Sequence, residues 1–64
     1  MNIFDYVAHV HGCDQETANE IVFEVVDCLK EIENINMSDI DNALLYDLGI
    51  EADFATDLIN LVFA

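Results

Sequence analysis

The sequence predicts an all-α protein, a compact bundle of four short helices that forms a single domain over residues 1–64. Three observations support this prediction. Apolar residues recur at helical spacing, the two glycines fall where helical segments end, and the chain contains no proline. Strand patterns are weak, because the β-branched residues follow the helical period and do not alternate.

The first half of the chain predicts one short and one long helix. We expect the first from about Asn2 to His11 and the second from about Asp14 to Glu33. Asn2 and Asp14 are candidate N-caps, because their side chains accept hydrogen bonds from amides of the first turn, and Gly12 ends the first helix. The apolar face of the first helix comprises Ile3, Val7 and Val10, flanked by Phe4 and Tyr6. The second helix has one apolar arc, formed by Ala18, Ile21, Val22, Val25, Cys28, Leu29 and Ile32.

The second half predicts a linker and two further helices. Residues 34–36 read as the linker, and residues 38–41 resemble a capping box that begins at Ser38, with Asp in place of the usual Glu. We expect the third helix to run to about Leu48, where Gly49 stops it, and the fourth to run from Ala52 to the end. The inner face of the fourth helix comprises Phe54, Leu58, Leu61 and Val62.

The charge balance limits the kinds of partner. Fourteen Asp and Glu residues accompany a single Lys, Lys30, and the net charge is −13 at pH 7. Free nucleic acid is excluded as a partner, because phosphate binding needs Lys and Arg. An anionic membrane surface is excluded for the same reason. Adaptation to high salt is an alternative source of the acid excess.

The apolar content points to self-association. Hydrophobic residues make up 55% of the chain, above the usual ~45–50%. A chain of 64 residues buries only about 60% of the surface that its unfolded form exposes. We therefore expect a homodimer, with Phe23 and the last helix as the candidate interface.

The sequence gives no sign of an enzyme, a cofactor or a metal site. His9, His11 and Cys13 lack zinc-ligand spacing, because residues two apart on a helix point away from each other. No calcium loop occurs, and capping roles suffice to explain Thr17 and Ser38, so we find no nucleophile with its base.

A soluble protein in the cytosol, with reduced thiols, is the expected location. The chain opens without the basic region of a signal peptide, and no stretch approaches the ~20 apolar residues of a membrane span. The two cysteines have no framework spacing, as expected in a reducing compartment.

The best functional signal is a row of carboxylates on the second helix, here called the acid row. On a wheel of 100° per residue the row occupies a stripe about 80° wide and roughly 22 Å long. Neighbouring like charges at these spacings repel, and an ordinary solvated face would interleave Lys or Arg. The row is therefore either such a solvated face or a rod of fixed charge that imitates backbone phosphates. Its members are Glu16, Glu20, Glu24, Asp27 and Glu31.

One aromatic residue accompanies the acid row. Phe23 falls beside the row on the wheel, away from the predicted apolar arc. It is either covered by another helix of the bundle or exposed as an anchor for a partner or a second copy. We include it with the five acids among the candidate partner-binding residues.

In size, charge, helicity and acid row, the chain resembles the small acidic proteins of phages and plasmids that mimic nucleic acid, of the anti-CRISPR and anti-restriction kind. The resemblance implies an inhibitor that occupies the basic DNA- or RNA-binding surface of a host defence nuclease complex or a regulator, in the host cytosol if it is phage-encoded. The alternative function is an acidic helical adaptor that docks on another protein through apolar surface. Salt should weaken binding by a mimic steeply and binding by an apolar adaptor little.

Overall fold

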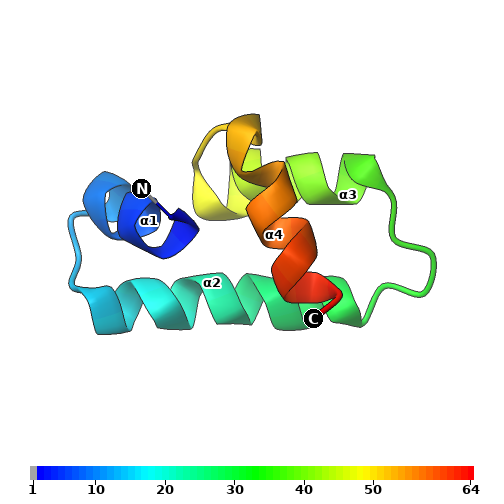
Figure 1. The fold of residues 1–64 in the computed structure, drawn as a ribbon, viewed down its shortest axis with the longest axis horizontal. Coiled ribbons are helices and arrows are strands. Elements are labelled where there is room, and N and C mark those ends of the chain that lie inside the picture. Colours follow the sequence, from blue (N-terminus) through cyan, green and yellow to red (C-terminus); the bar gives the residue numbers. More distant parts are fainter. Residues whose placement is uncertain (1) are drawn as a thin grey trace.

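The computed structural model describes residues 2–64 and confirms the all-α prediction (Figure 1). No strand occurs among these residues. The α-helices are α1 (Ile3–His11), α2 (Gln15–Lys30), α3 (Met37–Asn42) and α4 (Ala55–Val62). A π-helical segment, η1 (Ala43–Leu48), continues α3, and a 3₁₀ turn, η2 (Ala52–Phe54), leads into α4.

The ends of the first two helices follow the sequence prediction. The side chain of Asn2 accepts a hydrogen bond of 2.9 Å from the backbone N–H of Asp5. The side chain of Asp14 accepts one of 2.8 Å from the N–H of Thr17. Gly12 caps α1 in the left-handed conformation at φ 64°, which glycine adopts without steric strain. The caps therefore fix where α1 ends and α2 begins.

Three predicted boundaries were wrong. The last helix was expected from Ala52 to the end of the chain, but it is α-helical only over Ala55–Val62, after the 3₁₀ turn η2. The capping box of α3 begins at Asn36 and not at Ser38: the Asn36 side chain accepts from the N–H of Asp39, whose carboxylate accepts from the N–H of Asn36. Asn36 serves because its amide oxygen accepts the bond as a Ser hydroxyl would. The second helix ends at Lys30, three residues before the predicted end at Glu33.

The third helix ends before Gly49, as predicted, but its last part is wider than an α-helix. The N–H groups of Gly49 and Ile50 both donate to the carbonyl of Leu44, five and six residues earlier. The wide turn buries Leu44 and Leu48 and leaves residues 45–47 on the surface. π-helical turns are rare and occur frequently at functional sites.

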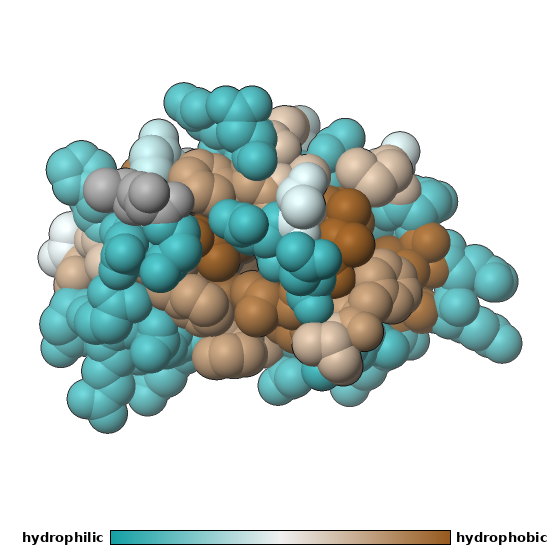
Figure 2. All heavy atoms as spheres, viewed as in Figure 1, coloured by the Kyte–Doolittle hydropathy of each residue, from teal (hydrophilic) through white to brown (hydrophobic). Residues whose placement is uncertain are grey.

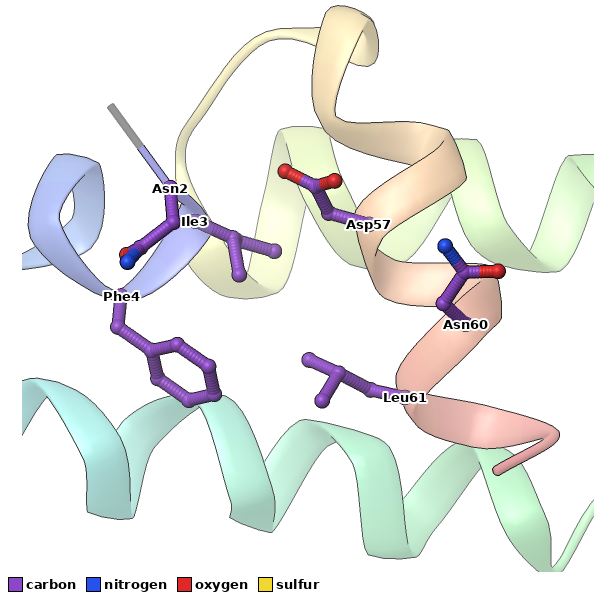
Figure 3. Close-up of a pocket in the computed structure, with 6 residues that line it drawn as sticks. All are labelled: Asn2, Ile3, Phe4, Asp57, Asn60 and Leu61. Atoms are coloured by element: carbon purple, nitrogen blue, oxygen red, sulfur yellow. The ribbon is translucent and has the colours of Figure 1, made fainter.

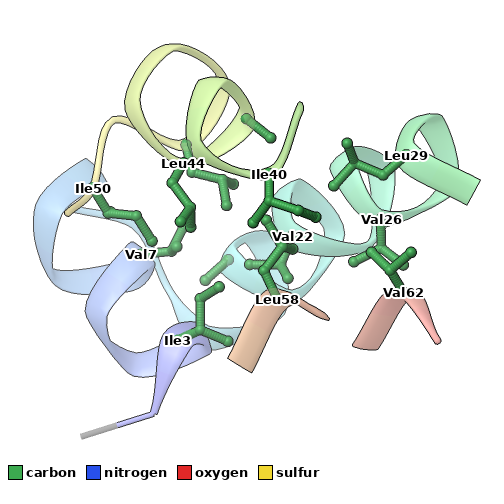
Figure 4. Packing of buried hydrophobic residues seen from close by; sticks show 13 residues of the cluster. Ile3, Val7, Val22, Val26, Leu29, Ile40, Leu44, Ile50, Leu58 and Val62 are labelled. Carbon is green, nitrogen blue, oxygen red and sulfur yellow. The ribbon is translucent and has the colours of Figure 1, made fainter. Parts of the chain in front are cut away.

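The core lies between α2 and the helices on one side of it (Figure 4). α2 contributes Ala18, Val22, Val26 and Leu29. This stripe is rotated from the predicted arc toward Val26, and α1, α4 and η1 pack against α2. Cys28 and Ile32, predicted to be inside, are exposed, and so is Val10 of α1, at 45%. Of the predicted inner face of the last helix, Leu58 and Val62 in α4 are buried, whereas Phe54 in η2 and Leu61 in α4 are only partly covered.

The arrangement leaves the far side of α2 uncovered. α2 forms a rod along one edge of the molecule, and the remaining helices lie on one side of it (Figure 1). α3 runs back in the opposite direction, whereas α4 crosses α2 and does not lie alongside it (Figure 1). The compact bundle is therefore confirmed, but its helices are not all aligned with one another, because α4 crosses α2.

Candidate partner-binding surface

The acid row lies on the uncovered side of α2. All five of its carboxylate side chains are exposed. The buried stripe of α2 lies on roughly the opposite side of the helix, so the packing that buries the stripe turns the row outward. Glu31 follows the last helical residue, and its near-helical backbone at φ −80° and ψ −13° continues the line of the row.

The charge density of the row is roughly two-thirds of that of a nucleic acid strand. Five carboxylates extend over roughly 22 Å of helix axis. One strand of duplex DNA carries about six or seven phosphates over that length, at about 3.4 Å per phosphate. Lys30 is the single Lys or Arg of the chain, so at most one acid of the row has such a partner within the molecule.

Local sequence explains why α2 presents such a long row. The segment from Gln15 to Lys30 contains neither glycine nor proline, so nothing interrupts its four and a half turns. Asp14 fixes its start, where hydrogen bonds from the Thr17 hydroxyl and, second, from the Thr17 backbone N–H lower the pKa of the Asp14 carboxyl. Lys30 lies in the last turn, where a cation favours the helix dipole. These features stabilise α2 against the repulsion within the row.

Phe23 is partly covered by another helix and partly exposed, so each of the two predicted alternatives holds for part of its side chain. Its side chain is 48% exposed, while its ring packs against that of Phe4 on α1, with ring centroids 5.4 Å apart. The covering helix is therefore α1, and it covers Phe23 only in part. The rest of the ring is available beside the acid row.

The histidines and Cys13 lie outside α2, whereas Cys28 lies on α2 beside the acid row. Nε2 of His11 lies 2.7 Å from the backbone carbonyl oxygen of Leu48 and links the end of α1 to the end of η1. Cys13 is half-buried and Cys28 is exposed, and both are free thiols. Within residues 2–64, no group of three or more His, Cys, Asp or Glu side chains is placed to hold a metal ion.

Two of the hollows on the described surface lie between different pairs of helices. The first separates the start of α1 from α4, has a volume of about 260 Å³, and lies next to the ring of Phe4 (Figure 3). Hydrophobic side chains gather on the face that contains it, over α4 and beside α1, with hydrophilic ones at both ends (Figure 2). Its lining residues are Asn2, Ile3, Phe4, Asp57, Asn60 and Leu61.

The second hollow, here called the α2–η1 groove, has a volume of about 400 Å³. Glu24 of the acid row belongs to it, and so does Tyr46, whose side chain is 80% exposed. Tyr46 was not among the residues that the sequence predicted to bind a partner. Its one signal in the sequence is its place three residues before Gly49, where the helix ends. The residues that line the groove are Ile21, Glu24, Val25, Cys28, Tyr46 and Asp47.

Comparisons of the chain with protein-family models, with curated proteins and with solved structures gave no match. Among the described residues, none of the helices has the length and apolar character needed to cross a bilayer.

Proposed function

We propose that this protein mimics nucleic acid and inhibits a host defence nuclease complex, or a regulator, by occupying its basic DNA- or RNA-binding surface. The observation that carries the proposal is the acid row: five exposed carboxylates in one line on the uncovered side of α2, at roughly two-thirds of the linear charge density of a DNA strand. On this proposal the protein acts by binding and not by catalysis.

The energetics of the row favour a role in binding. Its four neighbouring pairs, at separations of three or four residues, each destabilise the helix by about 0.2–0.5 kcal/mol. A solvated face with no function gains nothing from this repulsion. A basic groove on a partner would reverse the sign of the interaction, because each carboxylate would then face a cation across a partly desolvated interface.

Half-exposed Phe23 extends the proposed contact surface. Aromatic side chains beside charged ones are frequent interface anchors, because they bury much apolar area and lose little conformational entropy. In this proposal, the acid row supplies long-range attraction and register, and Phe23 supplies apolar contact at the edge of the row.

The experiment uses duplex DNA fixed to a resin and loaded with bacterial lysate at low salt. Wild-type protein should release a subset of the bound proteins. The variant Glu20→Gln/Glu24→Gln/Asp27→Asn/Glu31→Gln should release far less of them. The control Asp5→Asn/Glu51→Gln/Asp53→Asn/Asp57→Asn loses the same number of charges from exposed positions outside the row and should act like wild type. Equal release by both variants, or none by wild type, would contradict the proposal.

The alternative, an adaptor that docks through apolar surface, is favoured by the exposure of Phe63 at 66% and of Tyr46 at 80%. Salt separates the two functions. Between about 50 and 200 mM salt, the affinity of a mimic for a released protein should fall tenfold or more, whereas that of an apolar adaptor should change little.

A further inference from the structure

The α2–η1 groove differs in chemistry from the acid row that it adjoins. Its floor is apolar and comes from α2, where Ile21 and Val25 are partly exposed. Carboxylates stand on both sides, Glu24 on α2 and Asp47 on η1. Tyr46 of η1 also lines the groove. The groove therefore combines aliphatic surface, an aromatic ring and two negative charges within one hollow.

Two features of the fold create the groove. The buried stripe of α2 is rotated toward Val26, so the flank that contains Val25 and Cys28 is only partly covered. The π-helical turn of η1 then directs Tyr46 and Asp47 outward beside that flank, while Leu44 and Leu48 hold the segment in the core. The lining thus comes from segments about 20 residues apart in the sequence.

None of the residues that line the groove is basic. Lys30 is the single Lys or Arg of the chain, and on the helical wheel it falls on the side of α2 away from Cys28 and Val25. A matching occupant must therefore come from another molecule.

We propose that the α2–η1 groove binds one arginine side chain of a protein partner. The guanidinium stacks on the Tyr46 ring and donates hydrogen bonds to Glu24 and Asp47, and the aliphatic stem lies over Val25. Arginine fits better than lysine, because its planar group both stacks on aromatic rings and bonds to two carboxylates at once. The proposed function supplies one premise of this inference, namely that the partner is basic. The inference goes further, because it names an arginine side chain of that partner and the groove residues that bind it.

The test uses two peptides of equal charge, acetyl-Lys-Lys-Gly-Arg-Gly-Lys-Lys-amide and the same peptide with Lys in the centre. Wild-type protein should bind the arginine peptide about two- to fivefold more tightly. Tyr46→Ala should abolish the preference, and Tyr46→Phe should retain it, since Phe keeps the aromatic face. Phe63→Ala removes a similarly exposed aromatic residue that does not line the groove and should leave the preference unchanged. Equal binding of both peptides by wild type, or an undiminished preference in Tyr46→Ala, would overturn the proposal.

The two cysteines provide a second readout that general charge attraction would not reproduce. Cys28 is exposed and lines the groove, whereas Cys13 lies outside it. The bound arginine peptide should slow alkylation of Cys28 by iodoacetamide and leave that of Cys13 unchanged. No protection of Cys28 at saturating arginine peptide would count against the groove as the site.

Experiment can refute the arginine site in the groove and the mimic function of the acid row independently of each other. Glu16→Gln/Glu20→Gln/Glu31→Gln leaves the groove residues intact and should weaken both peptides alike, preserving the preference for arginine. A wild-type protein that prefers the arginine peptide yet releases nothing from DNA resin would refute the mimic and leave the groove standing. Release from DNA resin without a preference for arginine would refute the groove alone.

Discussion

Neutralising the acid row should stabilise the fold. The variant Glu20→Gln/Glu24→Gln/Asp27→Asn/Glu31→Gln removes one or both charges from all four neighbouring pairs of the row. At about 0.2–0.5 kcal/mol per pair, the expected gain in unfolding free energy is roughly 1–2 kcal/mol. Loss of negative charge near the C-terminus of α2, at Asp27 and Glu31, adds to the gain, because the helix dipole disfavours anions there. All four side chains are exposed, so the substitutions disturb no buried contact.

The assay is thermal unfolding followed by far-UV circular dichroism at low ionic strength. In a domain of this size, a gain of roughly 1–2 kcal/mol raises the Tm by roughly 5–15 °C. Added salt should narrow the difference from wild type, because screening weakens the repulsion that the variant removes. A Tm equal to or below that of wild type at low salt would refute the claim that the row is destabilising. Since the variant should also lose partner binding, unfolding cannot imitate the combined result.

The remaining predictions concern caps, pH and assembly. In thermal melts, Asn36→Ala should lower the free energy of unfolding by about 1 kcal/mol. Ser38→Ala, at the cap position predicted from the sequence, should change it little. A larger loss in Ser38→Ala than in Asn36→Ala would contradict the observed capping box. Hydrogen bonds from Thr17 lower the pKa of the Asp14 carboxyl below its ordinary 3.8. The stability that these bonds give is therefore present above pH 3.8 and is lost as the pH falls through the lowered pKa. In thermal melts below about pH 4, the stability difference between wild type and Asp14→Asn should shrink. Light scattering at micromolar protein should give twice the 7.2 kDa chain mass, and Phe23→Ser should shift it toward the monomer; 7.2 kDa at every wild-type concentration would contradict the dimer.

Local chemistry made the helix ends at Asn2, Gly12 and Asp14 predictable. Each boundary depends on a residue whose own side chain or backbone conformation decides it. The capping box of α3 was misplaced because residues 36–41 offer two overlapping candidates, and the sequence alone does not rank Asn36 against Ser38. The energy difference between neighbouring caps is small, and tertiary packing decides between them.

The orientation of α2 was predictable only in part. Its apolar residues cover a wider arc than its neighbours bury, so periodicity alone did not decide whether Val26 or Cys28 faces the core. The acid row was predictable, because its residues belong neither to the predicted arc nor to the observed buried stripe. The α2–η1 groove was not, since it depends on where the π-helical turn places Tyr46 relative to Val25. Contacts between distant segments of this kind have no local sequence signature.

If the acid row takes the place of nucleic acid on a basic surface, DNA and this chain must exclude each other from the partner. A protein released from the DNA resin is bound to the immobilised wild-type chain, and duplex DNA is then titrated in while binding is followed by surface plasmon resonance. Saturating DNA should remove the bound protein completely, and no complex of this chain, the partner and DNA should form. A stable ternary complex, with the partner holding DNA and this chain at once, would contradict it.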